Sequence, residues 1–400
     1  MRILFVVDGR SPIALNWIGY FANQGHDVHL VSTFQCDPEM PLGSFEFIPV
    51  AFSSAKVGRQ SLAGGKSLTT RGRGIWGARL VGVRTGVRQW LGPFTITIAA
   101  NKLVKVLRRV KPDLIHAMRI PYEGMLAAAA TGRLHSTDIS VPPLVVSVWG
   151  NDFTLHAAAN FMMASFTRRV LQWTDGLHTD CKRDQRLAFQ WGFANQKPAI
   201  VLPGNGGIQL DLFYPSKGEV GPVVINPRGI RAYIRNDIFF QAIPEVLKRL
   251  PATRFLCTGM AGDKQVSRWV TQLGIHHAVE LLPTQTHPAM AELFRRAQVA
   301  VSPSIHDGTP NTLLEAMACG CFPVAGDIES LREWITPGEN GLLFDPNDSG
   351  SLAEALCKAL SQPERRRTAA EINHRLVTER ADYTRVMPEA ELFYRRMIEE

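Results

Sequence analysis

Short apolar runs and amphipathic stretches alternate along most of the chain. Residues 2–7 form an apolar run, residues 13–23 have helical spacing, and residues 27–32 form a second apolar run. Residues 222–227 and 237–250 repeat this order in the second half of the chain. Strands that alternate with helices build parallel sheets, so we predict an α/β protein.

The clearest pattern is a strand, a loop, a helix and a further strand in the second half of the chain. An apolar run over residues 298–302 ends at Pro303, and a polar loop follows. Thr309 offers a hydroxyl for the helix N-cap, and Pro310 suits the first helical position. Gly320 is a natural end for the helix. We therefore predict a loop at the carboxyl end of a parallel strand, where open α/β sheets bind ligands.

Two acidic residues lie in this pattern. Asp307 is in the loop, eight positions before Glu315 in the helix. Asn311, Thr312 and Leu313 open the helix, and we expect their backbone N–H groups to bind phosphate. Glu315 shares a helix face with this opening turn and could reach ribose hydroxyls. Asp307 lies just beyond it. The predicted contacts to ribose, phosphate and the group beyond the phosphates follow the order of these parts in a sugar nucleotide.

The stretch resembles the acid-x7-acid motif of the retaining GT-B glycosyltransferases of the large fourth family. That motif contains Pro-Ser, then Glu-Gly, then Glu-Ala-Met-Ala-x-Gly; Pro303-Ser304, Asp307-Gly308 and residues 315–320 match it, with Asp307 in place of the usual Glu. The resemblance implies two Rossmann-like domains facing across a cleft. Asp307 would bind the donor sugar, and Gly308 would lie beside it. The alternative is a buried helix in which Glu315 only complements the helix dipole.

Two arginines form a second group of candidate site residues. The family places an Arg after the first strand of its second domain, and Arg228 matches it. Arg235-Asn236 stands where the family usually has Lys-Gly. The resemblance implies that both cations bind the diphosphate, on which negative charge grows as the glycosidic bond breaks. It also implies a front-side mechanism without a dedicated base, and neither a metal nor any other cofactor. Solvated surface arginines are the alternative for Arg235.

The resemblance names further candidates. Family members carry a His near the end of the strand at residues 113–116, so His116 becomes a catalytic candidate, although a lone His is more often structural. The candidates on the acceptor side are Arg10, Tyr122, Asn151 and Asp152. Gly9 and Gly259, each after a predicted strand, are candidates for the nucleotide side. The chain has no G-x-G-x-x-G after its first strand, so a dinucleotide site is poorly supported.

The domain limits follow from a Gly- and Pro-containing stretch at residues 203–215, which resembles the crossover between the two domains of the family. We predict an acceptor-side domain over residues 1–203 and a nucleotide-sugar domain over residues 204–380. We expect residues 381–400 to form a helix that packs back toward the first domain.

The length and composition of the chain agree with a two-domain protein. The chain has 400 residues, of which 45% are hydrophobic, and the length favours two domains. No apolar run reaches the roughly 18 residues of a membrane span, and the first strand is too short for a signal peptide. The six cysteines show no paired spacing, so we expect reduced thiols, a cytoplasmic protein and no structural zinc.

The positive charge is uneven. The net charge is +8, yet residues 47–112 contain thirteen Lys and Arg and no acid. Residues 51–74 have the composition of a loop, and residues 75–94 show a basic amphipathic pattern with tryptophans. We predict contact with an anionic membrane surface, to which the enzyme would bind peripherally, and no nucleic-acid partner. A helix that packs on the core with a solvated arginine face is the alternative.

The sequence therefore predicts a retaining transferase that moves a sugar from a nucleoside-diphosphate sugar to an acceptor, either a glycan or a lipid-linked acceptor. Two alternatives stay open: a GT-B epimerase of sugar nucleotides, and a catalytically silent protein that binds nucleotide or membrane. The nucleotide base, the sugar and the acceptor are not specified by the sequence.

Overall fold

The structure is a computed structural model that describes residues 1–51, 53, 76–136, 141–216, 218 and 220–399; for residues 76–91 and 93 it describes the backbone alone. The chain divides into two compact units. Unit 1 comprises residues 1–179, 184–201 and 391–400, and unit 2 comprises residues 180–183 and 202–390. The passage after Val201 lies beside the predicted boundary, whereas residues 381–390 group with unit 2.

Unit 1 is built on a seven-stranded parallel sheet with the strand order β3-β2-β1-β4-β5-β6-β7. Its strands are β1 (Arg2–Val7), β2 (Asp27–Ser32), β3 (Ser44–Phe47), β4 (Leu114–Met118), β5 (Leu144–Val148), β6 (Gly176–Thr179) and β7 (Ala199–Val201). The helices are α1 (Pro12–Asn23), α2 (Trp76–Val110), α3 (Met125–Leu134), α4 (Phe161–Trp173) and α5 (Lys182–Trp191), with shorter turns η1 (Ile120–Gly124), η2 (Asp152–His156) and η3 (Ala157–Ala159). β1, β4 and β5 are almost wholly buried and nearly all apolar, as strands covered on both faces must be.

Helix α2 extends well beyond the amphipathic pattern that we identified at residues 75–94, because it runs without a break from Trp76 to Val110. Ala100, Leu103 and Leu107 of its second half are buried in the core of unit 1. Lys102 and Lys105 face outward. The second half is thus amphipathic and packs on the core. The side chains of residues 76–91 and the loop expected at residues 51–74 lie outside what the structure describes, apart from residues 51 and 53.

The last ten residues complete the core of unit 1. Tyr394 of α12 (Tyr383–Glu399) is 1% exposed and stacks on Phe21 of α1, with 4.8 Å between the ring centroids. Its hydroxyl accepts a hydrogen bond from Trp17 Nε1 at 2.9 Å and bonds to His116 Nδ1. Residues from both ends of the sequence therefore share one buried hydrogen-bond network.

Unit 2 contains a six-stranded parallel sheet with the order β10-β9-β8-β11-β12-β13. The strands are β8 (Val223–Asn226), β9 (Arg254–Cys257), β10 (Val279–Leu281), β11 (Val299–Ser302), β12 (Phe322–Gly326) and β13 (Leu342–Phe344). The helices are α6 (Asn236–Arg249), α7 (Lys264–Gln272), α8 (His287–Arg295), α9 (Asn311–Ala318), α10 (Ser349–Ser361), α11 (Pro363–Ala381) and the start of α12, with the turn η4 (Leu331–Glu333).

Two apolar clusters flank this second sheet, so helices cover both of its faces. Phe239 and Phe240 of α6 are fully buried in one cluster, and Leu314 and Met317 of α9 are fully buried in the other. Each unit is a Rossmann-like layer of helix, sheet and helix, as the sequence predicted. In the part of the chain that the structure describes, no helix combines the length and the apolar character needed to cross a bilayer.

The buried network of Tyr394 yields a test. Tyr394→Phe keeps the ring but leaves Trp17 Nε1 and His116 Nδ1 without their shared partner. We expect a loss of about 1–3 kcal/mol in the free energy of unfolding, measured by urea denaturation. Tyr214→Phe, at a tyrosine that is 46% exposed, is the control and should change little. Equal effects of the two substitutions would contradict a stabilising role for the network.

Candidate active site

The loop between β11 and α9 carries the two acids. α9 begins at Asn311, and Pro310 is its N-cap residue without any side-chain cap bond. The expected cap at Thr309 was wrong, because the Thr309 hydroxyl donates its hydrogen bond to the carbonyl of Asp180. The N–H of Leu313 donates to the Pro310 carbonyl at 2.8 Å, so it is not free for phosphate as we had expected. Asn311 and Thr312 carry the first N–H groups of the helix, which have no acceptor within it.

Arg228 lies at the start of α9, between the two acids. Its guanidinium forms an ion pair with Asp307, with 2.6 Å between Nη2 and Oδ2. Nη1 donates to the hydroxyl of Thr312 at 3.2 Å. Both partners of the ion pair are at most 14% exposed. Among the described residues, Nε of Arg228 and the side-chain oxygen of Asn311 are buried without a hydrogen-bond partner. This corner of the site retains unused polar atoms.

Glu315 is 5% exposed, on the second turn of α9. Burial raises the pKa of Glu315 to about 7, while the positive charge of Arg228 pulls in the opposite direction. Arg228 therefore acts on both acids: it pairs directly with Asp307 and stabilises the charged form of Glu315. The structure brings Arg228, Asp307, Thr312 and Glu315 together, as the sequence predicted for a single site.

Several residues that we did not predict fix the loop. The hydroxyl of Ser304 donates to Oδ2 of Asp307 at 3.1 Å, and the hydroxyl of Ser330 donates to the Asp307 carbonyl at 2.7 Å. A Cβ atom at Gly308 would lie 2.2 Å from Oδ2 of Asp180, so no larger residue fits there. Ser304 belongs to the Pro-Ser pair of the motif, but nothing local in the sequence marks Ser330 or Asp180.

The loop that carries Arg228 is held by amides. Asn226 donates from Nδ2 to the side chain of Asn236 at 3.0 Å and accepts from the N–H of Arg228 at 3.1 Å. Asn236 in turn donates to the carbonyl of Gly229 at 2.8 Å. Gly259 approaches Gly229 closely, and both have positive φ, at 69° and 62°. Gly259 thus lets two strand-end loops meet.

The side chain of Arg235 has a different set of partners from Arg228. Its guanidinium forms an ion pair with Asp237, with 2.8 Å between Nη2 and Oδ2, and Nη1 bonds to Asn347. The structure does not bring its side chain into the group around Arg228, so the predicted diphosphate contact of Arg235 has no support in this arrangement.

His116 occupies the interior of unit 1. The residue is 0% exposed, its Nε2 bonds to Ser147 at 2.7 Å and its Nδ1 bonds to Tyr394. Burial and the neighbouring His178 hold the pKa of His116 well below its usual value. A buried neutral ring with both nitrogens occupied has a structural role here. The catalytic role predicted for His116 is left without support.

The other candidates of unit 1 follow the ends of its strands. Arg119 donates to the side chains of Asp152 and Asn151, and Asp152 also accepts from the N–H of Ile120 at 3.1 Å. With 1% exposure, Asp152 holds the two loops together. Tyr122 is 8% exposed, with φ at 70°.

Gly9 and Arg10 lie in the loop after β1. The N–H of Gly9 donates to the hydroxyl of Ser32 at 3.0 Å, and a Cβ atom there would lie 2.5 Å from Sγ of Cys36. Close packing against Ser32 and Cys36 therefore explains why a glycine stands at position 9. Arg10 pairs with Asp8 and stacks on Phe34.

Within the described ranges, one group could offer three ligand atoms to a metal. It is formed by Asp180, Cys181 and Asp184, neighbours along one stretch of the chain, whose ligand atoms lie within 4.8 Å of one another. All three are buried and make other interactions. We assign no metal to this group.

Comparison with known families decides the assignment. Residues 9–204 match the family model described as "Glycosyl transferase 4-like domain", and residues 228–362 match the model "Glycosyl transferases group 1". The two models together cover most of the chain and both of its units. The chain belongs to the GT4-type glycosyltransferases of the GT-B fold. The motif at Asp307 and Glu315 lies in the part that matches the group 1 model.

Curated relatives of this family match over limited lengths. An exopolysaccharide phosphotransferase of Streptomyces coelicolor is 35% identical over 229 residues, which are 56% of this chain and 22% of that protein. A D-inositol 3-phosphate glycosyltransferase of Thermomonospora curvata is 33% identical over 113 residues, which are 28% of this chain and 26% of that protein. The chain thus spans about a quarter of the length of each of these two relatives.

Solved GT-B structures resemble the whole chain. Sucrose-phosphate synthase from Thermosynechococcus elongatus superposes with a TM-score of 0.73 and 16% identity, over 99% of each chain. Anabaena HepE in complex with UDP-glucose gives 0.72 and 16% identity, over 98% of this chain and 99% of that one. At this identity the likeness shows the fold alone.

The raised pKa of Glu315 gives a prediction for stability. The folded protein binds this proton more tightly than the unfolded chain, whose Glu has its ordinary pKa. The stabilisation is complete below about pH 4.5 and is lost as the pH rises through about 7. We expect Glu315→Gln to gain up to about 3 kcal/mol over the wild type between pH 4.5 and pH 8.

Urea denaturation at several pH values measures this difference. Glu339→Gln, at an exposed glutamate of the same unit, is the control and should follow the wild type at every pH. A Glu315→Gln variant whose stability runs parallel to that of the wild type would show that folding does not raise the pKa of Glu315.

Proposed function

We propose that the chain transfers a glycosyl group from a nucleoside-diphosphate sugar to a hydroxyl-bearing acceptor, with retention of the anomeric configuration. The observation that carries this proposal is the position of Arg228 between Asp307 and Glu315 at the start of α9. One cation, two acids and a helix N-terminus are the groups that a diphosphate sugar needs from its binding site.

In this proposal Arg228 exchanges partners when the donor binds. Without donor, its guanidinium neutralises Asp307. With donor, the guanidinium and the first N–H groups of α9 bind the diphosphate, and Asp307 becomes free to accept hydrogen bonds from sugar hydroxyls. Glu315 binds the ribose hydroxyls. The growing charge on the leaving diphosphate then meets a cation and a helix dipole that are already in place, so the transition state gains more than the ground state.

The leaving phosphate takes the proton of the acceptor hydroxyl in this mechanism, as the family resemblance implies, and no metal is required. UDP is the first nucleotide to test, because the Anabaena relative was solved with UDP and with UDP-glucose. The names of the curated relatives are those of transferases, so no specific observation favours the epimerase or the silent binding protein over this reading.

Separate substitutions of the two acids test the proposal. Glu315→Ala should weaken binding of bare UDP by roughly tenfold to a hundredfold, because a charge-assisted hydrogen bond to ribose is lost. Asp307→Ala should bind UDP at least as tightly as the wild type, because Arg228 loses its internal partner, while turnover collapses. Calorimetric titration of UDP gives the affinities, and NMR of the anomeric proton gives the rate and the stereochemistry.

The same assays, run with EDTA, test the absence of a metal requirement. Normal turnover by Asp307→Ala would refute the assignment of the donor sugar to Asp307. Product with the inverted anomeric configuration would refute the proposed retention.

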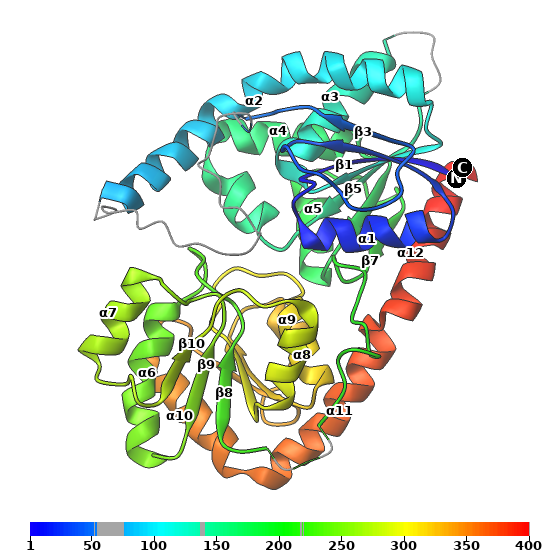
Figure 1. Cartoon of the computed structure of the whole chain (residues 1–400). Helices are drawn as coiled ribbons and strands as arrows, with labels where there is room; N and C mark the ends of the chain where they lie inside the picture. The colour runs from blue at the N-terminus through cyan, green and yellow to red at the C-terminus, as the bar shows by residue number, and fades with distance from the viewer. Residues whose placement is uncertain (52, 54–75, 137–140, 217, 219, 400) are drawn as a thin grey trace. The chain divides into compact units, whose positions relative to one another are not determined.

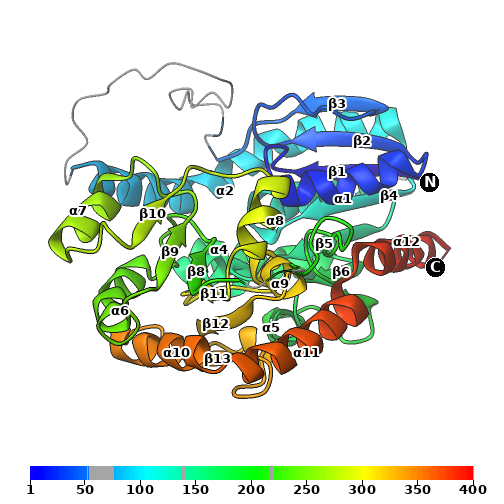
Figure 2. The ribbon, with the colours of Figure 1, turned by 60° about the horizontal axis from the view of Figure 1, so that its bottom comes forward.

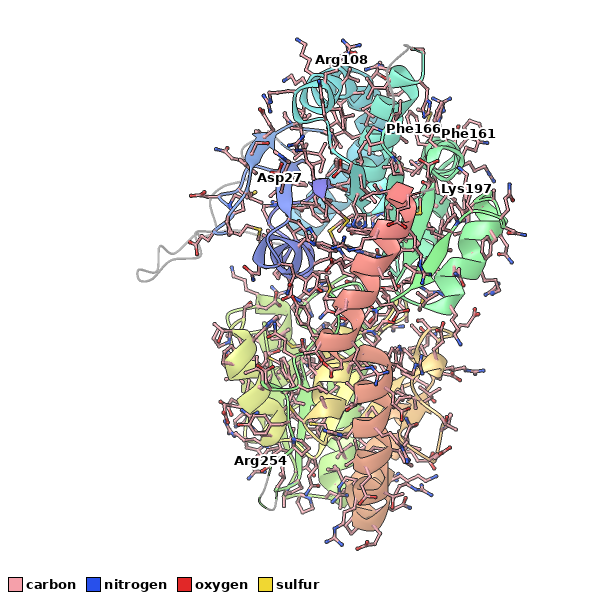
Figure 3. All side chains as sticks on the ribbon, turned by 90° about the vertical axis from the view of Figure 1, so that its right-hand side faces the viewer. Asp27, Arg108, Phe161, Phe166, Lys197 and Arg254 are labelled. Carbon is pink, nitrogen blue, oxygen red and sulfur yellow. The ribbon has the colours of Figure 1, made fainter. Side chains whose placement is uncertain are left out.

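We also propose that unit 1 meets an anionic membrane surface that presents a lipid-linked acceptor. The described part of α2 supports this, because Phe94 and Ile98 are 61% and 72% exposed and lie just before the outward lysines 102 and 105. Exposed apolar side chains beside cations suit the interface of an anionic bilayer. Figure 3 labels Arg108 of the same helix and Phe161 of α4, which is 79% exposed, at the surface of unit 1.

Sedimentation with vesicles tests the membrane proposal. We expect binding to anionic and not to neutral vesicles, weakened at 1 M salt, where the Debye length falls to about 3 Å. The double variant Phe94→Ser, Ile98→Ser should bind at least about tenfold more weakly, because each side chain buries apolar area in the bilayer. Leu392→Ser, at a leucine that is 48% exposed on α12, is the control. Equal binding of all variants would contradict the proposal.

A further inference from the structure

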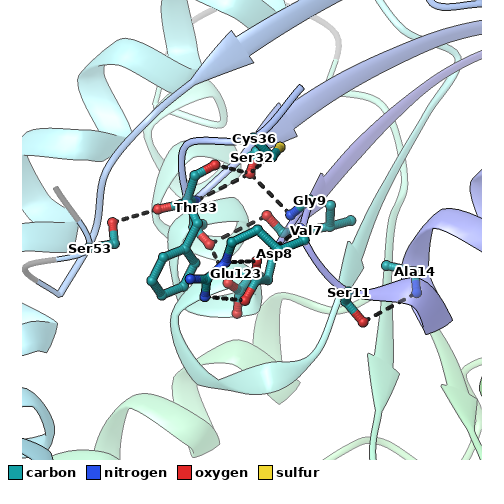
Figure 4. A network of polar contacts seen from close by, with 12 residues as sticks. Val7, Asp8, Gly9, Ser11, Ala14, Ser32, Thr33, Cys36, Ser53 and Glu123 are labelled. Carbon is teal, nitrogen blue, oxygen red and sulfur yellow. Dashed lines mark hydrogen bonds and ion pairs between the residues drawn. The ribbon is translucent and has the colours of Figure 1, made fainter. Parts of the chain in front are cut away.

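A second buried acid lies at the strand ends of unit 1. The strand order of this sheet changes direction between β1 and β4, because β1 pairs with β2 on one side and with β4 on the other. Open α/β sheets bind ligands outside the carboxyl ends of the strands at such a point. The loops that follow β1, β2 and β4 meet there around Glu123 (Figure 4).

Glu123 is 3% exposed and bonds to Thr33, whose hydroxyl lies 2.5 Å from Oε1. Thr33 is itself held on two further sides. Its N–H donates to the Val7 carbonyl at 2.8 Å, and its carbonyl accepts from the hydroxyl of Ser53 at 2.5 Å. Thr33 is therefore a fixed point, and Glu123 attaches the turn after β4 to it.

That turn has an unusual backbone. Tyr122 has φ 70° and ψ −56°, and Arg119 has φ 125°, although neither is a glycine. Such conformations persist only where the surroundings impose them, and they concentrate at functional sites. Three anchors impose them here: the bond from Ile120 N–H to Asp152, the bond from Gly124 N–H to the Arg119 carbonyl, and the bond between Glu123 and Thr33.

The charge of Glu123 depends on its neighbours. The pKa of Glu123 is raised to about 7, mainly by burial, and Asp8 in the loop after β1 contributes in the same direction. Arg119, which opens the turn, and the bond to Thr33 act in the opposite direction. Arg10, beside Asp8, also faces this carboxyl group. Of the three anchors of the turn, the bond to Thr33 is the one made by a carboxyl group poised to change charge near neutral pH.

We propose that Glu123 is a positioning residue for the acceptor: its neutral carboxyl group, bonded to Thr33, holds the turn Ile120–Gly124 in the form that a hydroxyl-bearing acceptor requires, and its ionisation loosens that turn. This inference rests on the proposed transferase function for its purpose, but not for the coupling of charge to structure. On ionisation the proton passes to solvent and a buried negative charge remains beside Asp8. The bond from Thr33 favours the charged carboxylate, but the cost of burial is larger, so the turn opens and lets water solvate the charge.

Hydrogen exchange measured by mass spectrometry tests the coupling without any substrate. Wild type, Glu123→Gln and the control Glu39→Gln, at an exposed glutamate of unit 1, are compared between pH 6 and pH 8.5. After correction for intrinsic exchange, we expect protection of residues 119–124 in the wild type to fall by about tenfold across this range, as for one titrating group. Glu123→Gln keeps a neutral amide and should stay protected, whereas Glu39→Gln should follow the wild type.

Kinetics then test the link to the acceptor, with p-nitrophenyl hexosides as acceptor probes and UDP-glucose as donor. The KM for the hexoside should rise about tenfold above neutral pH in the wild type and stay constant in Glu123→Gln, while the KM for the donor should change alike in both. A KM for the hexoside that rises equally in both proteins would overturn the positioning role.

The exchange experiment and the kinetic experiment test the role of Glu123 and the transferase function separately. If no donor turns over, the transferase proposal fails, and the exchange experiment still decides whether Glu123 controls the turn. If Glu123→Gln and the wild type lose protection in parallel, the coupling is wrong even where transfer is observed. Thr33→Val, which removes the hydroxyl partner of Glu123, should lower protection of the turn at pH 6 already.

Discussion

The ion pair between Arg228 and Asp307 is the interaction on which the candidate site of unit 2 depends. A carboxylate at 14% exposure would be costly to leave unpaired, and so would a guanidinium at 10% exposure. Each makes the other tolerable, and the amides of Asn226 and Asn236 hold the arginine loop in the required place. The same cation also moderates the cost of burying Glu315. Two acids thus remain largely buried because a single arginine interacts with both.

The sequence was most informative where a structural element and its chemistry occupy neighbouring positions. The strand, loop and helix around Asp307 and Glu315 carry their own turn and packing signals, and both the parallel sheets and the grouping with Arg228 could be predicted. The errors come from partners that are distant in sequence. Thr309 gives its hydroxyl to the carbonyl of Asp180, 129 positions away, instead of capping its own helix.

His116 follows the same rule, whereas the partner that holds Arg235 is close to it in sequence. His116 looked like a site residue, yet its ring nitrogens are taken by Ser147 and by Tyr394, the latter 278 positions along the chain. Arg235 stands at the position where the family has its lysine, but Asp237, two residues on, captures it. A motif gives the position of a charge, whereas the neighbours decide which group the charge meets. For His116 those neighbours are distant in sequence and cannot be recognised from one sequence.

The two units use the same edge of their sheets in different ways. In unit 2 the acid after β11 forms an ion pair with an arginine. In unit 1 the acid after β4 bonds to a threonine, and the nearest arginines already hold other acids, since Arg10 pairs with Asp8 and Arg119 with Asp152. One arrangement suits a ligand that arrives with negative charge. The other suits a neutral ligand with hydroxyl groups.

The position of Tyr394 near the end of the sequence affects when unit 1 can complete its fold during synthesis. Its ring packs against Trp17, Phe21 and His116, all of which leave the ribosome hundreds of residues earlier. Unit 1 therefore cannot finish its core during synthesis of its own strands, and it has to wait with an open apolar surface while all of unit 2 is translated. A chain that is released early, or a recombinant unit 1 that stops at the crossover after Val201, lacks this closing residue. Expression of unit 1 by itself would need residues 391–400 supplied as a fused or separate peptide.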